Sequence, residues 1–353
     1  MVTWAPWAGI RPRLIAATRQ TRRTAIGTVL IMFAVTAARI DADDPLSGMD
    51  LGERPDPVAP DGWTTVTVKA TALNHHDVWT LRGVGISADR LPIVLGCDAA
   101  GLDAEGNEVI VHSVIADADA GGGDETLDPR RSLLSERYDG TFAQQVVVPR
   151  RNLVPKPAVL SFEQAACLPT AYLTAYKMLF EKSGVQPGST ILVQGAGGGV
   201  ATALILLGRA AGFRMWATSR SEAKQERALK LGADRSFPAG ARLPERVDVV
   251  METVGQATWG HSVRSLKPGG RIVISGATSG DAPPAELTRI FFTQLSVTGS
   301  TMGSRDQLLR LARFLEQTGT RPAIDRVLPL EAARDGFAAM ISGDVFGKVV
   351  FTC

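Results

Sequence analysis

Cysteine and histidine are scarce in this chain of 353 residues, which has three cysteines and four histidines. Cys97, Cys167 and Cys353 lie far apart and form neither a CxxC pair nor an even framework. A secreted protein held together by disulfides is therefore not expected, and the predicted location is a reducing compartment, the cytoplasm. With so few strong ligands, any metal site would have to be built from very few side chains.

Long apolar runs are also missing, so stable insertion in a membrane is not expected. The longest candidate, residues 25–35, follows Arg22 and Arg23 as the apolar core of an export signal would, but it is too short to span a bilayer as a helix. We interpret Met32–Ile40 as the first strand of the folded protein and residues 1–31 as a basic, poorly ordered extension. An export signal is the alternative interpretation.

Charge is balanced over most of the chain. Residues 1–31 contain five arginines and no acidic residue, so the net charge of +2 leaves −3 for the remainder. A slightly acidic body gives no support for nucleic-acid binding.

Two patterns divide the chain into two halves. Between Met32 and Lys156, short alternating or apolar runs predict the strands of a β-rich barrel. These runs are residues 63–70, 91–95, 108–112 and 142–148. After Pro157, strand-like runs alternate with helical ones, which predicts a parallel, doubly wound sheet.

A glycine cluster follows the apolar run Thr190–Val193 and precedes the helical residues 202–207. Strand, glycine turn and helix in this order are typical of the entry to a dinucleotide-binding βαβ unit. Glycines let the backbone approach a pyrophosphate, whose charge then faces the N–H groups and positive end of the helix. The predicted cofactor contacts here are Gly195, Gly197, Gly198, Gly199 and Val200.

Four further motifs accompany this turn: Ala72–Gly83, Gly96–Gly101, Thr170–Tyr176 and Gly347–Val350. In this order they resemble the medium-chain dehydrogenase/reductase superfamily, closest to its quinone oxidoreductase-like and zinc-binding-dehydrogenase-like members. The resemblance implies an α/β fold, in which a Rossmann doubly wound parallel sheet is inserted in a β-rich GroES-like barrel catalytic domain. The implied catalytic domain comprises residues 32–158 and 300–353, and the implied cofactor domain comprises residues 159–299.

The end of the second strand of the cofactor sheet distinguishes the two nicotinamide dinucleotides. NADH enzymes place a carboxylate there against the ribose hydroxyls, whereas this chain has Ser219 and Arg220. A hydroxyl and a planar guanidinium can bind a 2′-phosphate, and Lys224 adds positive charge, so we predict NADP(H). A helix N-cap followed by solvated charge is the alternative interpretation. The resemblance also implies that Thr174 lies near the nicotinamide ribose and Lys348 near the pyrophosphate.

The same resemblance indicates where a catalytic zinc would be bound. Zinc alcohol dehydrogenases have a Cys at the position of Asn74, a His at that of Cys97 and a third ligand near Ala166. Because two of these three positions carry poor or absent ligands, no metal ligand is predicted. The region 112–138 also lacks the four cysteines of the family's structural zinc.

An improvised metal site is the alternative to a metal-free protein. It would combine Cys97, the His75–His76 pair and Asp98.

Without a Lewis acid, a conjugated carbonyl is easier to reduce than a simple ketone, because the negative charge spreads onto an enolate oxygen. We therefore predict a homodimeric, NADPH-dependent reductase of quinones or α,β-unsaturated carbonyls. Asn74, Asp77 and Trp79 are the candidate catalytic-pocket residues, although Asn74 and Asp77 also fit a turn held by side-chain hydrogen bonds. The alternatives are a zinc-type alcohol dehydrogenase with degenerate ligands and a non-catalytic NADPH-binding sensor.

Overall fold

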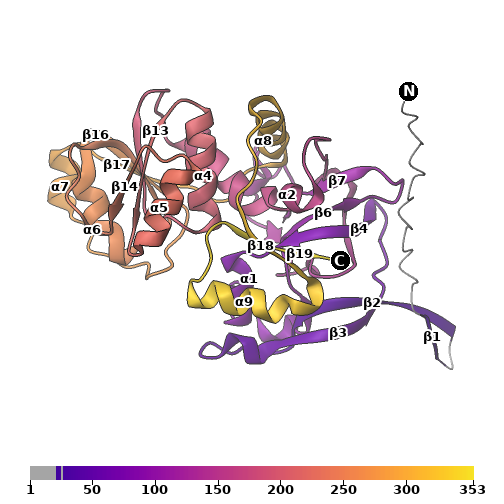
Figure 1. Ribbon diagram of the computed structural model, residues 1–353. Coiled ribbons are helices and arrows are strands. Elements are labelled where there is room, and N and C mark those ends of the chain that lie inside the picture. Colours follow the sequence, from indigo (N-terminus) through magenta and orange to yellow (C-terminus); the bar gives the residue numbers. More distant parts are fainter. Residues whose placement is uncertain (1–20, 25–26) are drawn as a thin grey trace, which may run out of the picture.

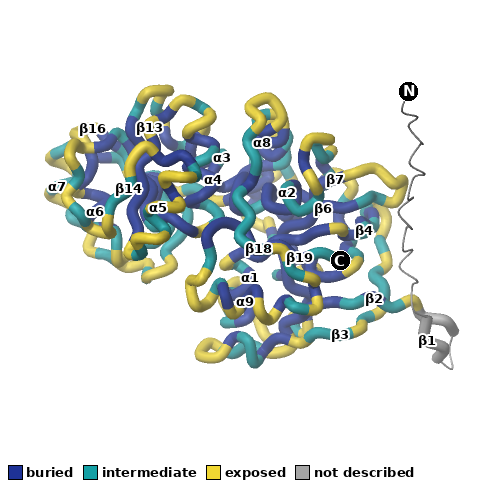
Figure 2. The backbone as a smooth tube through the Cα atoms, in the orientation of Figure 1, coloured by how far each residue is buried: buried dark blue, intermediate teal, exposed yellow. Residues whose placement is uncertain are grey.

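The computed structural model describes residues 21–24 and 27–353, and the side chains of residues 30–353. Two parts lie side by side, one built mainly from the first half of the chain and one around a parallel sheet (Figure 1). Each part has a buried interior under an exposed rim (Figure 2).

The parallel sheet has six strands in the order β14-β13-β12-β15-β16-β17, and every pair in it is parallel. Its strands are β12 (Thr190–Val193), β13 (Arg214–Ser219), β14 (Arg235–Pro238), β15 (Val247–Glu252), β16 (Leu266–Ile274) and β17 (Ser296–Gly299). The prediction of a doubly wound parallel sheet is therefore confirmed.

Helices cover both faces of this sheet, which explains why its central strand is a continuous apolar run. In β12, Ile191 and Val193 belong to the cluster that includes Leu204 of α4, whereas Leu192 packs in a second cluster with Trp259 of α6. The helices of this part are α4 (Gly199–Ala210), α5 (Glu222–Leu231), α6 (Gln256–Ser265) and α7 (Leu287–Phe292).

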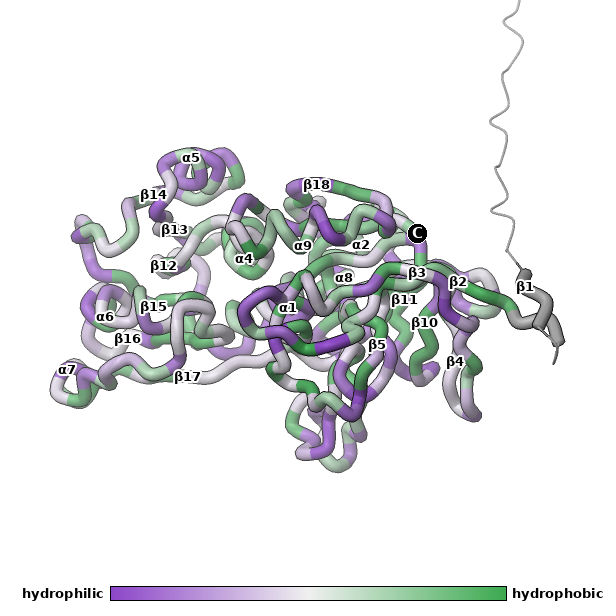
Figure 3. Tube along the Cα trace, turned by 90° about the horizontal axis from the view of Figure 1, so that it is seen from below, coloured by the Kyte–Doolittle hydropathy of each residue, from purple (hydrophilic) through white to green (hydrophobic). Residues whose placement is uncertain are grey.

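The strand-rich part consists of separate sheets and contains no closed barrel among the described residues, so the predicted barrel is corrected. One sheet has the order β1-β2-β3, with β5 also paired to β2; β2 is largely hydrophobic (Figure 3). Its strands are β1 (Thr21–Thr24), β2 (Gly27–Ala37), β3 (Met49–Pro55) and β5 (Ile93–Val94).

The larger sheet of this part has the order β11-β7-β6-β4-β19-β18, with β10 also paired to β4. Its strands are β4 (Trp63–Ala72), β6 (Asp98–Leu102), β7 (Glu108–Val111), β10 (Gln145–Pro149), β11 (Leu153–Pro155), β18 (Ile324–Pro329) and β19 (Lys348–Thr352). A short pair, β8 (Val114–Ile115) and β9 (Ser132–Leu133), lies outside it.

The end of the chain returns to this sheet. β19 pairs antiparallel with β4, so that Val350 lies opposite Ala72, and α9 (Ala333–Ser342) packs close to α1 (His75–Leu81). The parallel sheet is thus an insertion in the strand-rich part, as the resemblance implied. α8 (Arg305–Thr318) begins just after the chain leaves the parallel sheet.

An irregular helix links the two parts. Ser161 Oγ accepts a hydrogen bond from the Gln164 backbone amide, and the Gln164 side chain accepts one from the Ser161 backbone amide, so the two residues form a capping box. α2 (Phe162–Ala166) and α3 (Leu173–Lys177) are joined by the π-helical segment Leu168–Tyr172, and a second π-helical segment, Met178–Lys182, follows.

The extension predicted for residues 1–31 lies partly outside the described residues. Residues 21–24 form β1, and residues 27–31 already belong to β2, so the first strand starts before the expected Met32. No described helix is both long and apolar enough to cross a membrane.

Candidate functional site

The glycine turn between β12 and α4 has the open backbone that a bound pyrophosphate requires. Gly195 and Gly197 have φ values of +77° and +140°, which disfavour side chains, and Gly198 is the N-cap of α4. A Cβ on Gly198 would meet no atom within 4 Å, so the space before the helix is free. Val200 follows in the first turn, where backbone N–H groups have no partner within the helix.

A network of buried polar side chains fixes the start of this turn at the end of β12. Thr218 accepts a hydrogen bond from the Gly195 amide and donates to Gln194 at 2.7 Å. The Gln194 amide nitrogen lies 2.8 Å from His261 Nδ1 and donates to Ser262, which in turn donates to the buried Glu252. Because His261 Nε2 also lies 2.9 Å from the carbonyl of Ala241, the bonds fit a neutral imidazole with its proton on Nε2.

The strand-end residues predicted to bind a 2′-phosphate lie together beside the turn. Ser219 ends β13 and is buried, and its hydroxyl accepts a hydrogen bond from the Ser221 amide. Arg220 is exposed and has no hydrogen-bond or ion-pair partner among the side chains that the structure describes. Lys224 packs over the turn, because a Cβ on Gly197 would lie 3.0 Å from its Cδ, and its Nζ donates to the carbonyl of Gly343 at 2.7 Å.

Lys348 connects the glycine turn to the strand-rich part. Its aliphatic stem packs on the turn, since a Cβ on Gly199 would lie 2.9 Å from Lys348 Cδ. Its ammonium donates to Leu73 O at 2.8 Å, Asn74 Oδ1 at 2.6 Å and Asp98 Oδ2 at 3.0 Å. Burial raises the pKa of Asp98, while Lys348 opposes the shift. Among the described residues, the ammonium thus bonds only to groups of the strand-rich part, while the stem of Lys348 contacts the turn.

The three predicted pocket residues belong to α1 or its N-cap, and two of them, Asn74 and Asp77, stabilise the start of the helix. The backbone N–H of Asn74 donates to Asp77 Oδ2 at 2.8 Å, and the two residues form a capping box. The Asn74 side chain also donates to Asp98 at 2.8 Å. Trp79 is half-buried and lies 5.4 Å below the guanidinium of Arg82. Thr174, predicted near the nicotinamide ribose, is buried on α3.

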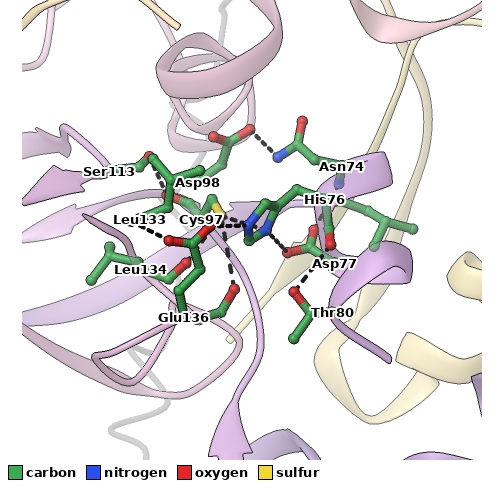
Figure 4. Close-up of polar contacts among 12 residues, drawn as sticks. Asn74, His76, Asp77, Thr80, Cys97, Asp98, Ser113, Leu133, Leu134 and Glu136 are labelled. Carbon is green, nitrogen blue, oxygen red and sulfur yellow. Dashed lines mark hydrogen bonds and ion pairs between the residues drawn. The ribbon is translucent and has the colours of Figure 1, made fainter. Parts of the chain in front are cut away.

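A second polar cluster surrounds His76, the second residue of α1 (Figure 4). His76 Nδ1 lies 3.2 Å from Cys97 Sγ, and its Nε2 lies 3.2 Å from Glu136 Oε1. Asp77 Oδ1 lies 3.8 Å from His76 Nδ1. Burial by itself lowers the pKa of His76, but Cys97, Asp77 and Glu136 raise it well above its ordinary value. Burial raises the pKa of the Cys97 thiol.

A cavity of about 330 Å³ opens beside this cluster, because Glu136 is one of its lining residues. The cavity lies between the segment that returns from the parallel sheet and the loop around β8 and β9. Its lining residues are Val114, Thr126, Pro129, Arg131, Ser132, Leu133, Glu136, Thr301 and Met302. None of the predicted pocket residues Asn74, Asp77 and Trp79 lines it.

The glycine turn follows the carboxyl end of β12, a central strand of a doubly wound sheet, and this sheet is inserted in a strand-rich unit. Together these features define a dinucleotide-binding dehydrogenase fold. The zinc-binding dehydrogenase family matches residues 199–317, and the alcohol dehydrogenase GroES-like domain matches residues 60–158. A zinc-type alcohol dehydrogenase-like protein of Schizosaccharomyces pombe is 31% identical over 346 residues, which is 89% of this chain and 99% of that protein. The chain therefore belongs to the medium-chain dehydrogenase/reductase superfamily of zinc-binding dehydrogenases.

Two further relatives differ in their described activity. The crystal structure of an NAD-dependent alcohol dehydrogenase is 36% identical, with a TM-score of 0.84 over 91% of this chain and 100% of that chain. A 2-methylene-furan-3-one reductase of Solanum lycopersicum is 31% identical over 294 residues, 81% of this chain and 70% of the reductase.

Zinc does not fit the ligand positions at which the zinc alcohol dehydrogenases bind it. Asn74 is a neutral amide whose oxygen already accepts from Lys348, and Ala166 has no donor atom. The neighbouring Cys167 is buried and its thiol donates to the carbonyl of Glu163. Of the alternative improvised set, Cys97 and His76 do meet, but Asp98 turns away to Lys348.

Several of these relationships were not found by sequence reasoning. Glu136 was not singled out, because it lies in a loop without a motif, and its contact with His76 spans 60 positions of the chain. The buried network through Gln194 and His261 was also missed, although polar residues at the end of an apolar strand were a usable signal.

Proposed function

We propose that this chain is an NADPH-dependent oxidoreductase that reduces α,β-unsaturated carbonyl compounds or quinones without a catalytic zinc. The observation that carries the proposal is the state of Asn74. At the position of the family's first zinc ligand, the chain has an amide that is hydrogen-bonded to Lys348 and Asp98. A neutral amide in this arrangement cannot replace a thiolate as a zinc ligand.

The preference for NADPH over NADH rests on residues of this chain. NADPH, when bound, supplies the hydride. The glycine turn leaves room for the pyrophosphate at the N-terminus of α4, and the free Arg220 guanidinium stands beside Ser219, where the 2′-phosphate would lie. No carboxylate at the end of β13 repels that phosphate. The similarity to an NAD-dependent dehydrogenase does not change this argument, because cofactor choice depends on these local residues.

The cavity beside Glu136 is the proposed substrate pocket. Its volume of about 330 Å³ suits a small molecule, and Val114, Leu133 and Met302 give it apolar walls. Arg131 and Thr301 bring hydrogen-bond donors that can hold the enolate oxygen formed when the β-carbon receives hydride. A proton from water completes the reduction. The name of the Solanum lycopersicum reductase, 2-methylene-furan-3-one reductase, denotes a conjugated ketone of this kind.

A second candidate function is alcohol oxidation, which the similarity to an NAD-dependent alcohol dehydrogenase favours. It would require a Lewis acid or an equivalent group for the alcohol oxygen.

The proposed enzyme is a cytoplasmic homodimer. β17 is an edge strand of the parallel sheet, and exposed apolar side chains gather beside it on α7: Leu287, Phe291 and Phe292, with 70%, 67% and 80% exposure. α7 lies at the end of the molecule away from the strand-rich part (Figure 1). Unpaired strand edges and exposed apolar patches of this kind favour association with a second copy.

The proposed location is supported by the cysteines. All three are free thiols, which suits a reducing compartment such as the cytoplasm.

Steady-state kinetics in the presence of a strong chelator test this proposal. We expect turnover of NADPH with a small enone or a 1,4-quinone that the chelator does not change, and no turnover with the matched saturated ketone. Chelator-sensitive oxidation of alcohols with NAD⁺ would instead support the alcohol dehydrogenase. Binding of NADPH without turnover of any of these compounds would support a sensor.

Light scattering of the purified protein and of Phe292→Lys tests the dimer.

A further inference from the structure

We propose that His76, Asp77 and Cys97 form a binding site for one soft divalent cation, such as Zn²⁺ or Co²⁺. This ligand set keeps one of the family's zinc positions, Cys97, but replaces the other two, where the chain has Asn74 and Ala166, by His76 and Asp77. It also differs from the set that the sequence suggested, because Asp77 takes the place of His75 and Asp98. It also revises the expectation that the chain has no metal ligand. Imidazole nitrogen, thiolate sulfur and carboxylate oxygen are the donors that zinc prefers in proteins.

The spacing of the three donor atoms suits a tetrahedral cation. Bonds of about 2.0 to 2.3 Å around one zinc ion separate its ligands by about 3.3 to 3.8 Å. Cys97 Sγ lies 3.2 Å from His76 Nδ1, and His76 Nδ1 lies 3.8 Å from Asp77 Oδ1. All three atoms lie within 4.8 Å of one another. Small side-chain shifts would therefore complete the site.

Asp77 supplies an independent observation. Its side chain is completely buried, and while Oδ2 caps α1, Oδ1 has no hydrogen-bond partner among the described residues. An unsatisfied carboxylate oxygen in a buried position is costly, and a cation beside it removes that cost. Oδ1 is the atom that lies near His76.

Glu136 completes the arrangement around His76. With Nδ1 facing Cys97, the opposite nitrogen, Nε2, lies 3.2 Å from Glu136 Oε1. Histidines that bind metals usually donate their second N–H to a carboxylate, which fixes the ring and strengthens the ligand. Glu136 itself is held by the Leu133 amide at 2.9 Å, so its carboxylate is oriented before any metal binds.

The nearby positive charge does not block this site. Lys348 is bound to Asp98 and to Asn74, so its ammonium is neutralised on a different carboxylate. Glu136 lines the cavity of about 330 Å³, and His76 is 20% exposed, which together provide an entry path to the buried sulfur. A bound cation would tie α1 to the strand-rich part at Cys97 and, through Glu136, to the loop after β9.

Titration of the purified, tag-free full chain with CoCl₂ tests the site, because thiolate-bound Co²⁺ has a charge-transfer absorption band. We expect one Co²⁺ per chain, release of protons from the Cys97 thiol and the His76 imidazole, displacement of Co²⁺ by Zn²⁺ and a higher melting temperature. Cys97→Ser should abolish the charge-transfer band, whereas Cys167→Ser and Cys353→Ser should keep it. No band in a folded wild-type chain, or a band that persists in Cys97→Ser, would overturn the proposal.

Matched variants separate the ligands from their neighbours. His76→Gln should weaken Co²⁺ binding at least about tenfold, while His75→Gln, one residue away, should not. Asp77→Asn retains an oxygen that can cap α1 but loses the negative charge, so it should weaken binding without unfolding the chain. Glu136→Gln should weaken binding about 10- to 100-fold. Equal effects of His75→Gln and His76→Gln would contradict the assignment.

Discussion

Lys348 Nζ lies 3.0 Å from Asp98 Oδ2, and the two side chains are 2% and 0% exposed. The pair joins the last strand of the chain to β6, and the stem of Lys348 also packs on Gly199 at the start of α4. One ion pair therefore connects the proposed cofactor turn with the proposed catalytic part. Buried pairs of this kind are sensitive to the loss of one partner, because the other charge is then left without compensation.

Replacing Lys348 by Met should lower the free energy of unfolding by about 3 to 5 kcal/mol. Chemical denaturation of the variant and the wild type measures this loss. In the double variant Lys348→Met/Asp98→Asn, the buried charge is absent, and most of the lost stability should return. A double variant no more stable than Lys348→Met would show that the charge on Asp98 is not the cause.

The stability of the single variant Lys348→Met should depend on pH in a characteristic way. Burial raises the pKa of Asp98 above its value in the unfolded chain, so the folded state loses stability as the pH rises from about 3.8 through the folded pKa. Lys348 limits this rise of the pKa. In Lys348→Met the interval should extend to higher pH, and the deficit relative to the wild type should be larger at pH 7 than at pH 4. A deficit that does not change with pH would contradict this.

Gly198→Ala should leave the fold intact but weaken NADPH binding. A Cβ at this position meets no protein atom within 4 Å, and φ is −71°, so the alanine is not strained. The methyl group would instead occupy space that the proposed pyrophosphate needs at the N-terminus of α4. Calorimetric titration with NADPH measures the effect. Gly52→Ala, equally free of contacts but in β3, is the control and should bind NADPH normally.

Arg220→Asp should raise the KM for NADPH far more than the KM for NADH. The loss of one charge-assisted contact and the gain of a repulsive carboxylate correspond to about 1.5 to 3 kcal/mol or more, which is roughly 10- to 100-fold or more in affinity. Arg313→Asp, an equally exposed position on α8, is the charge-matched control. Equal changes in both KM values would remove the basis of the predicted NADPH preference.

His112 should make the fold sensitive to acid. Burial lowers the pKa of His112, whose Nε2 lies 3.0 Å from the carbonyl of Gly303, although Glu125 and that carbonyl oppose the shift. Because the unfolded chain binds a proton at higher pH than the folded chain, this group destabilises the fold as the pH falls below about 6.5. His112→Gln should be less stable at pH 8 but should lose less stability between pH 7 and pH 5. Parallel stability curves for the two proteins would contradict this.

The elements that the sequence predicted well are those whose pattern is local. The apolar run Thr190–Val193 and the glycines after it each depend on residues that are close in the chain. Short strands such as β14 and β18 were not predicted, because their half-exposed residues carry no clear alternation. The predicted barrel is not closed in the part of the chain that the structure describes, and strand-like runs in a sequence do not show whether the sheets that they form close into a barrel.

The candidate site depends on contacts that no local pattern contains. Lys348 was expected to face the pyrophosphate, but its ammonium reaches Asn74, 274 positions away, while its stem touches the turn. Asn74 and Asp77 were proposed as pocket residues, and the structure uses both to begin α1. His76 was considered with His75, Cys97 and Asp98 as an improvised metal site; the fold brings it to Cys97, but also to Glu136, which the sequence did not indicate.

The most direct test of the proposed function is the fate of deuterium from NADPH labelled at C4 of the nicotinamide, followed by NMR of the reduced enone. The proposed chemistry predicts deuterium on the β-carbon of a saturated ketone, with and without a chelator. Deuterium on the carbonyl carbon of an allylic alcohol, formed only when metal is present, would contradict the account and identify a metal-dependent alcohol dehydrogenase.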